Sequence, residues 1–446
     1  MKLLIAAWAA LAAASAPVSD SEYLSRLATA ERELAAASRG GADKSEEHRM
    51  TMSRALQSLG DVRSQVGDHA GALEAYASMQ SLFLGSAVPQ GVPGDGHRAH
   101  VSSTLERFAP ESAIDAIVRA TQGRRIVILN EAHHVPRHRA FGMRLALELR
   151  KQGFTYLAME TFSPDVDSLA RRGYPTVVDG YYSDEPLFGD FIRQALRAGY
   201  RPIAYEQEYD AITESSDMVD RIESREEAQA NNLIERVLKR DPDAKLFVYV
   251  GYSHAFKGYQ EMPGNRRTAW MAERLRAKSG IDPLCIDQTT MIEPQPGSRD
   301  RALLDAIFAT RSDDAVVLVD KTAPGAFSSP DPARIEMQVF HRPTMPLRGR
   351  PDWLAMDGYR EPHAIPGKLL PKSGRRLVQA FVAGESADAV PIDQVLVTAG
   401  EPVPVFMLPR GKYRFATQDQ DTPLAAIYFG TERAFGGSVG FSSSSR

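Results

Sequence analysis

The most constraining feature of this sequence is a series of short apolar segments that alternate with amphipathic ones. Six segments are apolar almost throughout and have the length of β-strands: 125–130, 155–160, 201–206, 245–251, 282–287 and 315–320. Helical periodicity separates them at about 138–152, 187–198, 217–240 and 268–278. Strands buried on both faces and separated by helices predict an α/β fold, with a mostly parallel sheet covered by helices on both faces.

The segments on either side of this pattern differ from it. Residues 22–86 have helical spacing, and RALQSLGDVRSQVGDHAGALEAY within them resembles a single tetratricopeptide repeat. Because stacked repeats need about three units to bury a core, we expect a helical hairpin that packs on the main domain, with binding of a protein partner as the alternative. After a Gly- and Pro-rich linker at 86–100, the α/β catalytic or ligand-binding domain is predicted over 100–345.

The C-terminal part has short strands without intervening helices, so 373–430 predict a small β-sandwich and 435–446 a disordered tail. At the other end, Lys2, an apolar run and small residues predict a signal peptide over 1–16 and export to the periplasm or medium. No later stretch is long and apolar enough to predict a membrane span. Nucleic-acid binding is disfavoured, because 53 Lys and Arg against 57 Asp and Glu give a net charge of −4. The single Cys285 lies in an apolar strand and is expected to be a buried thiol.

Ionisable residues follow four of the predicted strands. Because the carboxyl ends of parallel strands meet at one edge of a sheet, we expect these side chains to converge there on a ligand. His133 and His134 are adjacent on a turn, so we expect them to point in different directions and only one to be catalytic. The residues at these strand ends are Glu131, His133, His134, Glu160, Glu206 and His254.

Three neighbouring glutamates require a compensating positive charge, or one of them must be protonated. Arg225 is one candidate, because it begins a polar stripe on the predicted 217–240 helix. A divalent Zn, Mn or Fe ion bound by His133, Glu160 and His254 is the second. In the third, one glutamate acts as a general acid while a histidine acts as base. The motifs for a zinc protease, a nucleophile elbow and a phosphate loop are absent from the sequence.

The stretch IVILNEAHHVPRHRAFGMRLALELRKQGFTYLAMETF, together with REEAQANNLIERVL and KLFVYVGYSHA, resembles a known superfamily. This superfamily joins erythromycin esterases, ChaN-like haem-binding proteins and Tiki/TraB proteins, and the resemblance covers about residues 120–290. It implies a shared site of Glu131, one histidine of the first loop, Glu160, Arg225 and His254. Esterase-like members space the acid and the histidine as E-x-x-H, which from Glu131 selects His134. The haem-binding and Tiki-like patterns select His133. Asn130 stands where these families commonly have Gly, which puts the tightness of this turn in question.

These observations favour an enzyme, a hydrolase that acts on an ester, lactone or amide in a small-molecule or peptide substrate. A histidine acts as general base, and Arg225 with His254 stabilises the oxyanion, with or without a metal. The alternative is a haem- or iron-binding protein without turnover, with a histidine, Tyr181 or Tyr182 as axial ligand. A third interpretation is a scaffold around an inactive site.

Overall fold

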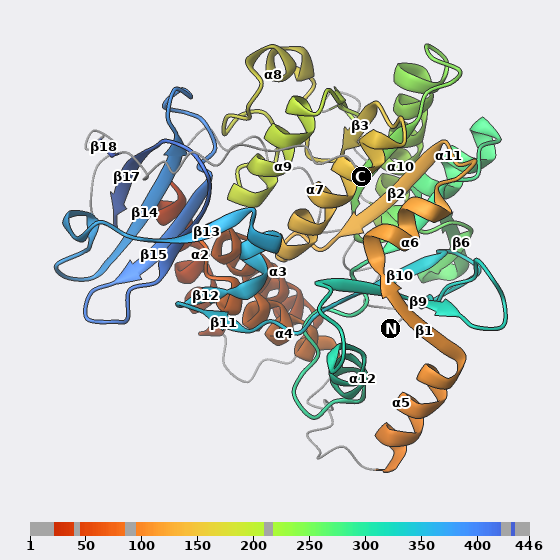
Figure 1. The fold of residues 1–446 in the computed structure, drawn as a ribbon, viewed down its shortest axis with the longest axis horizontal. Coiled ribbons are helices and arrows are strands. Elements are labelled where there is room, and N and C mark those ends of the chain that lie inside the picture. The colour runs from red at the N-terminus through yellow and green to blue at the C-terminus, as the bar shows by residue number, and fades with distance from the viewer. Residues whose placement is uncertain (1–21, 40–44, 85–94, 209–216, 421–429, 433–446) are drawn as a thin grey trace, which may run out of the picture.

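The computed structural model describes residues 22–39, 45–84, 95–208, 217–420 and 430–432. Figure 1 shows the N-terminal helices in red, an α/β domain on the right and a β-rich C-terminal unit on the left. The predicted signal peptide at 1–16 and the predicted tail at 435–446 lie outside the described residues. Within the described part of the chain, no helix combines the length and apolar character needed to cross a bilayer.

An eight-stranded sheet forms the centre of the α/β domain. Its strands are β1 (Phe108–Ser112), β2 (Ile126–Glu131), β3 (Tyr156–Met159), β4 (Arg201–Ile203), β5 (Leu246–Gly251), β8 (Leu284–Asp287), β9 (Ala315–Asp320) and β10 (Met337–His341). They are arranged in the order β1-β9-β10-β8-β2-β5-β3-β4. The six strands from β10 to β4 are parallel, whereas β9 and β1 are antiparallel to their neighbours. The predicted mostly parallel sheet is therefore confirmed.

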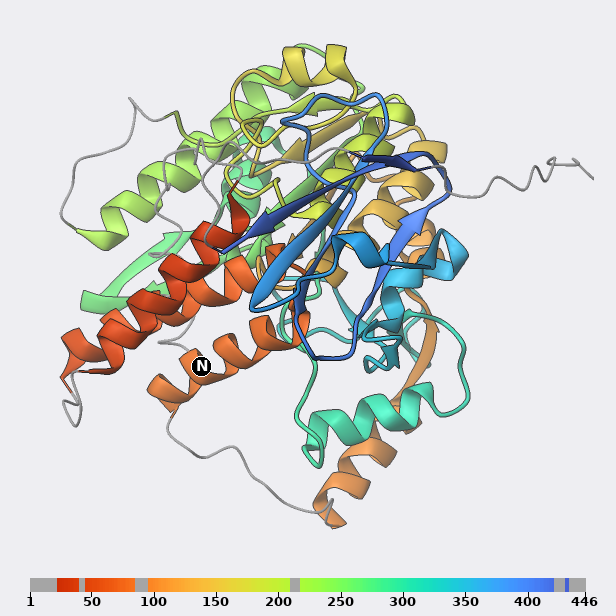
Figure 2. The same cartoon turned by 90° about the vertical axis from the view of Figure 1, so that its left-hand side faces the viewer.

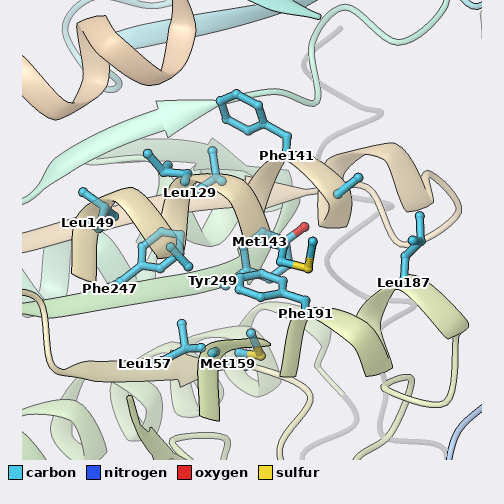
Figure 3. Packing of buried hydrophobic residues seen from close by; sticks show 14 of the residues in the cluster. Leu129, Phe141, Met143, Leu149, Leu157, Met159, Leu187, Phe191, Phe247 and Tyr249 are labelled. Atoms are coloured by element: carbon cyan, nitrogen blue, oxygen red, sulfur yellow. The ribbon is translucent and has the colours of Figure 1, made fainter. Parts of the chain in front are cut away.

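Helices cover both faces of this sheet, because successive side chains of a strand point to opposite sides. Leu129 of β2 packs in one core and Ile128 in the other. Figure 3 shows the first core, where the rings of Phe191 and Tyr249 lie 5.2 Å apart. On this face lie α6 (Ala113–Ala120), α7 (Pro136–Lys151) and α9 (Pro186–Arg197); on the other lie α10 (Met218–Leu233), its π-helical continuation η2 (Ile234–Leu238) and α11 (Met271–Ser279).

The described part of the N-terminal unit consists of α2 (Tyr23–Ser38), α3 (Glu46–Gln65) and α4 (His69–Leu84). α3 and α4 are the predicted hairpin, and α2 is a third helix beside them. Gly60 permits their close crossing, since a Cβ there would lie 2.5 Å from a ring carbon of Tyr76. α2 also packs on Leu377 of the C-terminal unit, and Figure 2 shows these helices beside the blue sheet.

The C-terminal unit consists of small antiparallel sheets with a shared core. Val378 and Phe406 come from different sheets and pack in the same apolar cluster, as in the predicted sandwich. The unit begins before the predicted residue 373, since its first strand starts at Arg360. One sheet pairs β13 (Arg360–Ala364) with β16 (Val405–Pro409); the other contains β15 (Asp393–Thr398), β14 (Arg375–Val382), β17 (Tyr413–Asp419) and β18 (Gly430–Glu432).

The remaining elements flank these layers or connect their strands and helices. The α-helices are α5 (Asp95–Arg107), α8 (Val166–Arg172) and α12 (Arg299–Phe308); the strand pairs are β6 (Tyr259–Met262) with β7 (Arg266–Ala269) and β11 (Pro346–Leu347) with β12 (Arg350–Pro351); the 3-10 turns are η3 (Tyr252–Ala255), η4 (Pro263–Asn265), η5 (Asp352–Gly358) and η6 (Gly367–Leu369). Two predicted boundaries shift by three residues. The strand predicted over 201–206 ends at Ile203, and the helix predicted from 268 begins at Met271, because the residues before it pair as β7.

Candidate active site

Four neighbouring strands deliver most of the predicted site residues to one edge of the sheet. β2, β5, β3 and β4 are adjacent in that order and parallel. Glu131 ends β2, Glu160 directly follows β3, and Glu206 and His254 lie in the segments after β4 and β5. The carboxyl ends of these strands therefore bring together residues that are more than 100 positions apart in the sequence.

The imidazole of His133 is oriented by Glu131, with its Nδ1 2.8 Å from Oε1 of the carboxylate. Arg139 donates to the same carboxylate at 2.8 and 3.2 Å, and the Tyr249 hydroxyl donates at 3.1 Å. Burial alone would raise the pKa of Glu131, but the charge of Arg139 and the hydrogen bond from His133 lower it to about 2. An ionised Glu131 accepts the Nδ1 proton, so Nε2 of His133 is the nitrogen that can act as a base.

Gly251 allows His133 and Glu160 to converge. Its N–H donates to Oε2 of Glu160 at 2.6 Å. A Cβ at this position would lie 2.8 Å from Nε2 of His133 and 3.0 Å from Oε2 of Glu160. The basic nitrogen and the carboxylate oxygen therefore border the same small space. The His133 side chain is 14% exposed, whereas those of Glu131 and Glu160 are 1% and 2% exposed, so the imidazole is the most accessible of the three groups.

Arg225 of α10 joins Glu160 to Glu206. Its Nη2 donates to both carboxylates, and its Nε is 3.0 Å from Oε1 of Glu206. Nε2 of Gln229, one turn further along α10, is 3.0 Å from the other oxygen of Glu206. Burial would raise the pKa of Glu160, but the charges of His254 and Arg225 lower it. The sequence left open whether an arginine, a metal ion or a proton compensates the neighbouring glutamates. In the structure, the guanidinium group of Arg225 lies between Glu160 and Glu206.

A carboxylate that the sequence analysis did not identify holds His254. Nδ1 of His254 is 2.7 Å from Oε1 of Glu226, and its Nε2 is 3.5 Å from Oε1 of Glu160. Burial would lower the pKa of His254, but the charges of Glu226 and Glu160 raise it. His254 is therefore favoured as an imidazolium beside Glu160. The sequence signal for Glu226 is only its place next to Arg225, since a glutamate on a helix usually faces solvent.

His134 and His133 point to different neighbours, as expected for adjacent turn residues. The His134 ring stacks on Tyr76 of α4 with centroids 3.3 Å apart, and its Nδ1 is 3.3 Å from the Tyr252 hydroxyl. Burial lowers the pKa of His134 well below its usual value, so this imidazole is neutral. His138 is buried and accepts the Ala132 N–H at 3.0 Å, so it supports the loop and does not cap α7.

Asn130 ties three adjacent strands together at this edge. Its Nδ2 donates to the carbonyl of Tyr252 at 3.0 Å and to Oδ1 of Asp287 at 2.9 Å, and its Oδ1 accepts the N–H of Gln288. These bonds link the ends of β2, β5 and β8. Asn130 is absent from the residues with positive φ, so the backbone here does not require the Gly that the resembling families commonly have.

The predicted metal ligands lie close together, since Nε2 of His133 borders Glu160 and Nε2 of His254 is 3.5 Å from Oε1 of Glu160, but each of the three has a protein partner. His133 directs Nδ1 to Glu131, His254 directs Nδ1 to Glu226, and Glu160 is bound by Arg225. In the described part of the chain, no group of three or more His, Cys, Asp or Glu side chains is placed to hold a metal ion. The donor set therefore does not fit the predicted divalent ion, because cationic side chains already neutralise its carboxylates.

The two tyrosines considered as haem ligands lie beside these residues. The Tyr182 ring is 4.4 Å from the His133 ring, and the Tyr181 hydroxyl is close enough to Glu206 and Arg225 for their charges to affect it. Cys285 is buried in β8, as predicted. Residues of the site that sequence reasoning missed are Arg139, Tyr249, Glu226, Asp61 and Tyr76, the last two from the N-terminal helices.

No family model matches this chain, and no curated protein is similar to it in sequence. Solved structures with a similarity to this chain include bacterial toxins. They include a structure described as "Bacterial protein toxins" (17% identity, TM-score 0.30, 61% of this chain and 57% of that one) and RRSP, a MARTX toxin effector domain from Vibrio vulnificus CMCP6 (16%, 0.27, 57% and 53%). A third is the C-terminal region of Pasteurella multocida toxin (10%, 0.30, 92% and 58%). The chain spans between half and three fifths of the length of these chains, and a likeness at this level assigns no activity to it.

Proposed function

We propose that this chain is a hydrolase that cleaves an ester, lactone or amide at the carboxyl ends of β2, β3 and β5. The proposal rests on side chains that converge at this edge of the sheet. His133 is oriented by the buried Glu131, and Glu160 lies between it and the cationic side chains of Arg225 and His254. The sequence resemblance to the superfamily of erythromycin esterases, ChaN-like and Tiki/TraB proteins supports it, and we propose membership of that superfamily. General base, orienting acid and oxyanion stabiliser are the parts that acyl hydrolysis by water requires.

His133 is the general base of this proposal. Glu131 is held ionised by Arg139 and fixes the Nδ1–H form of His133, so the lone pair of Nε2 is available. Nε2 takes a proton from a water molecule as the water oxygen attacks the substrate carbonyl carbon. The tetrahedral intermediate then collapses, the bond to the leaving group breaks, and the same proton passes to the leaving oxygen or nitrogen. His134 is unsuited to this role, because its ring is stacked between protein groups.

Arg225 and His254 are the proposed oxyanion stabilisers. Both are cationic, and Nη1 of Arg225 lies 3.4 Å from Nε2 of His254. Their other partners, Glu206 and Glu226, fix their positions before substrate arrives. Preorganised donors of this kind stabilise charge that develops on the carbonyl oxygen without reorganisation during the reaction. Glu160 lies between these cations and His133, where it orients the attacking water.

A hydrolysis screen tests this function. The purified protein is assayed with p-nitrophenyl esters, γ- and δ-lactones and p-nitroanilide amides, and the best substrate is used to compare variants. We expect His133→Gln to lower kcat/KM by about 100-fold or more, because a positioned base contributes that much. The matched control is His363→Gln, which changes a histidine in β13 of the C-terminal unit. Full activity of His133→Gln on the identified substrate would contradict the proposal.

The same purified protein tests the haem alternative. If no probe is hydrolysed and haemin gives a Soret shift that Tyr182→Phe or His133→Gln abolishes, binding without turnover replaces the hydrolase proposal.

We also propose that the protein is exported to the periplasm or medium, which the signal-like segment at 1–16 supports. Amino-terminal sequencing of the mature protein tests this export.

A further inference from the structure

The N-terminal helices contribute a carboxylate to the surroundings of the candidate active site. Asp61 lies on α3 directly after Gly60, the residue that permits the close crossing with α4. Its Oδ1 accepts a hydrogen bond from the Tyr76 hydroxyl at 2.8 Å. The Asp61 side chain is thus turned toward α4 and toward the part of α4 that meets the strand ends.

A chain of ring contacts connects Asp61 to the proposed base. Tyr76 stacks on His134 with an interplanar angle of 9°. His134 in turn contacts the hydroxyl of Tyr252, and the Tyr252 ring meets the His133 ring edge-on at 5.1 Å. The hydroxyls of Tyr76 and Tyr252 are also hydrogen-bonded to each other. These contacts join α3 and α4 to the loop that carries His133, although Tyr76 and His133 are 57 positions apart in the sequence.

The charge that acts most strongly on Asp61 is that of His133. Burial raises the pKa of Asp61 to about 6, and the charge of Glu131 adds to this rise. The charge of His133, the hydrogen bond from Tyr76 and the charge of Arg139 oppose it. The titratable and charged groups that face Asp61 therefore come from α4, from α7, from η3 with Tyr252, and from the end of β2 with its following loop. Asp61 has no arginine or lysine of its own at salt-bridge distance among the described residues.

We propose that Asp61 is a positioning residue for the reaction, supplied by the tetratricopeptide-like helices to stabilise positive charge on His133. This inference rests on the proposed function, because His133 gains that charge when its Nε2 takes the proton of the attacking water. The proton stays on Nε2 until the leaving group takes it, so the Asp61 carboxylate is not consumed. The N-terminal unit is then part of the active site and not a separate binding module.

The reactivity of His133 toward diethyl pyrocarbonate tests this inference without a substrate. The reagent carbethoxylates the unprotonated imidazole nitrogen, and mass spectrometry of peptides measures modification of His133 across pH. We expect Asp61→Asn to shift half-maximal modification to lower pH by about half a unit or more, because a nearby negative charge favours the imidazolium form. We expect Asp61→Glu, which restores the charge, to return the profile toward that of the wild type.

The matched control is Glu47→Gln, which removes an exposed negative charge from the same helix and should leave the profile unchanged. An unchanged profile in Asp61→Asn, with a wild-type melting temperature, would overturn the inference. If Asp61→Asn lowers the melting temperature, the pH profile of His133 modification in Asp61→Glu becomes the deciding measurement. A shift of that profile, despite the retained negative charge, would also overturn the electrostatic role of Asp61. On a substrate from the hydrolysis screen, we expect Asp61→Asn to lower kcat with KM little changed.

The two proposals fail separately. A shifted His133 profile with no hydrolysis of any probe contradicts the proposed function and leaves the influence of Asp61 on His133 intact. An active enzyme that depends on His133 but whose His133 profile ignores Asp61 contradicts only the inference.

Discussion

At the scale of the residue, the pair of His254 and Glu226 makes stability depend on pH. The raised pKa of His254 means that the folded protein binds this proton more tightly than the unfolded chain. The resulting stability is fully present below the unfolded pKa of about 6.5 and is lost as the pH rises through the higher folded pKa. Glu226 is the partner whose charge contributes most to this raised pKa.

We therefore predict that Glu226→Gln costs about 1–3 kcal/mol of unfolding free energy at pH 6 and less at pH 9. Urea denaturation at the two pH values measures the difference. The control, Glu235→Gln, removes an exposed glutamate from η2 of the same long helix and should change stability little at either pH. Equal losses for Glu226→Gln at both pH values would show that His254 is not held protonated by this carboxylate.

Gly251 gives a second prediction for a single residue. In Gly251→Ala, the new Cβ would press on His133 and Glu160, so one of them must move. We expect a loss of about 1–3 kcal/mol of stability from overpacking, and about 100-fold lower activity from the displaced base. Gly367→Ala is the control, because no atom lies within 4 Å of its added Cβ. Chemical denaturation and the hydrolysis assay measure the two effects, and normal activity in Gly251→Ala would contradict this geometry.

At the scale of the element, a buried ion pair attaches the C-terminal unit to the α/β domain. Arg360 of β13 donates to Asp190 of α9, and both side chains are 0% exposed. We predict that Arg360→Leu costs about 3–5 kcal/mol of unfolding free energy, because it leaves the Asp190 carboxylate buried without its cation. The exposed pair of Lys239 and Glu235 is the control, since Lys239→Leu should cost less than about 1 kcal/mol. A denaturation midpoint for Arg360→Leu close to that of the control would contradict this role of the pair.

Strands were predicted where burial on both faces coincided with an unbroken apolar run. β2 and β5 are buried along their whole length, and both were predicted from their apolar runs. β10 was missed although all of its residues are buried, because Gln338 and His341 interrupt its apolar run. β1 was missed, because this edge strand contains Pro110 and each of its residues is only partly buried. The hairpin of β6 and β7 was also missed, since Tyr259 and Glu261 of β6 are exposed and the buried Gln260 between them is polar, so no apolar run marks the strand.

At the scale of the whole molecule, the sequence indicated the edge of the sheet where the site lies, but not all of its members. Glu131, His133, Glu160 and His254 were found because strand ends converge in a parallel sheet. Arg139 was missed, because one arginine on a helix carries no signal of the direction in which it points. Asp61 was missed because its place near His133 depends on how the N-terminal helices dock, and docking leaves no periodic pattern in the sequence.

Removal of metal ions tests the arrangement of charges across the whole site. Because Arg225 and His254 neutralise the carboxylates, we predict that dialysis against EDTA leaves the hydrolysis rate unchanged. Addition of Zn²⁺ or Mn²⁺ after dialysis should not raise the rate. Loss of activity on dialysis with recovery on adding one of these ions, in a sample whose melting temperature is unchanged, would instead show that a metal takes part.

His133 is the proposed general base, and Glu131 holds it in the Nδ1–H form. A double-mutant cycle is the most direct test that these two residues act as one unit. kcat/KM is measured for the wild type, Glu131→Gln, His133→Gln and the double variant on one substrate. Since residues that act as a unit are strongly non-additive, we predict losses of about 100-fold or more for each single variant and no further loss in the double variant. Losses that multiply in the double variant, or a single variant with wild-type activity, would contradict it.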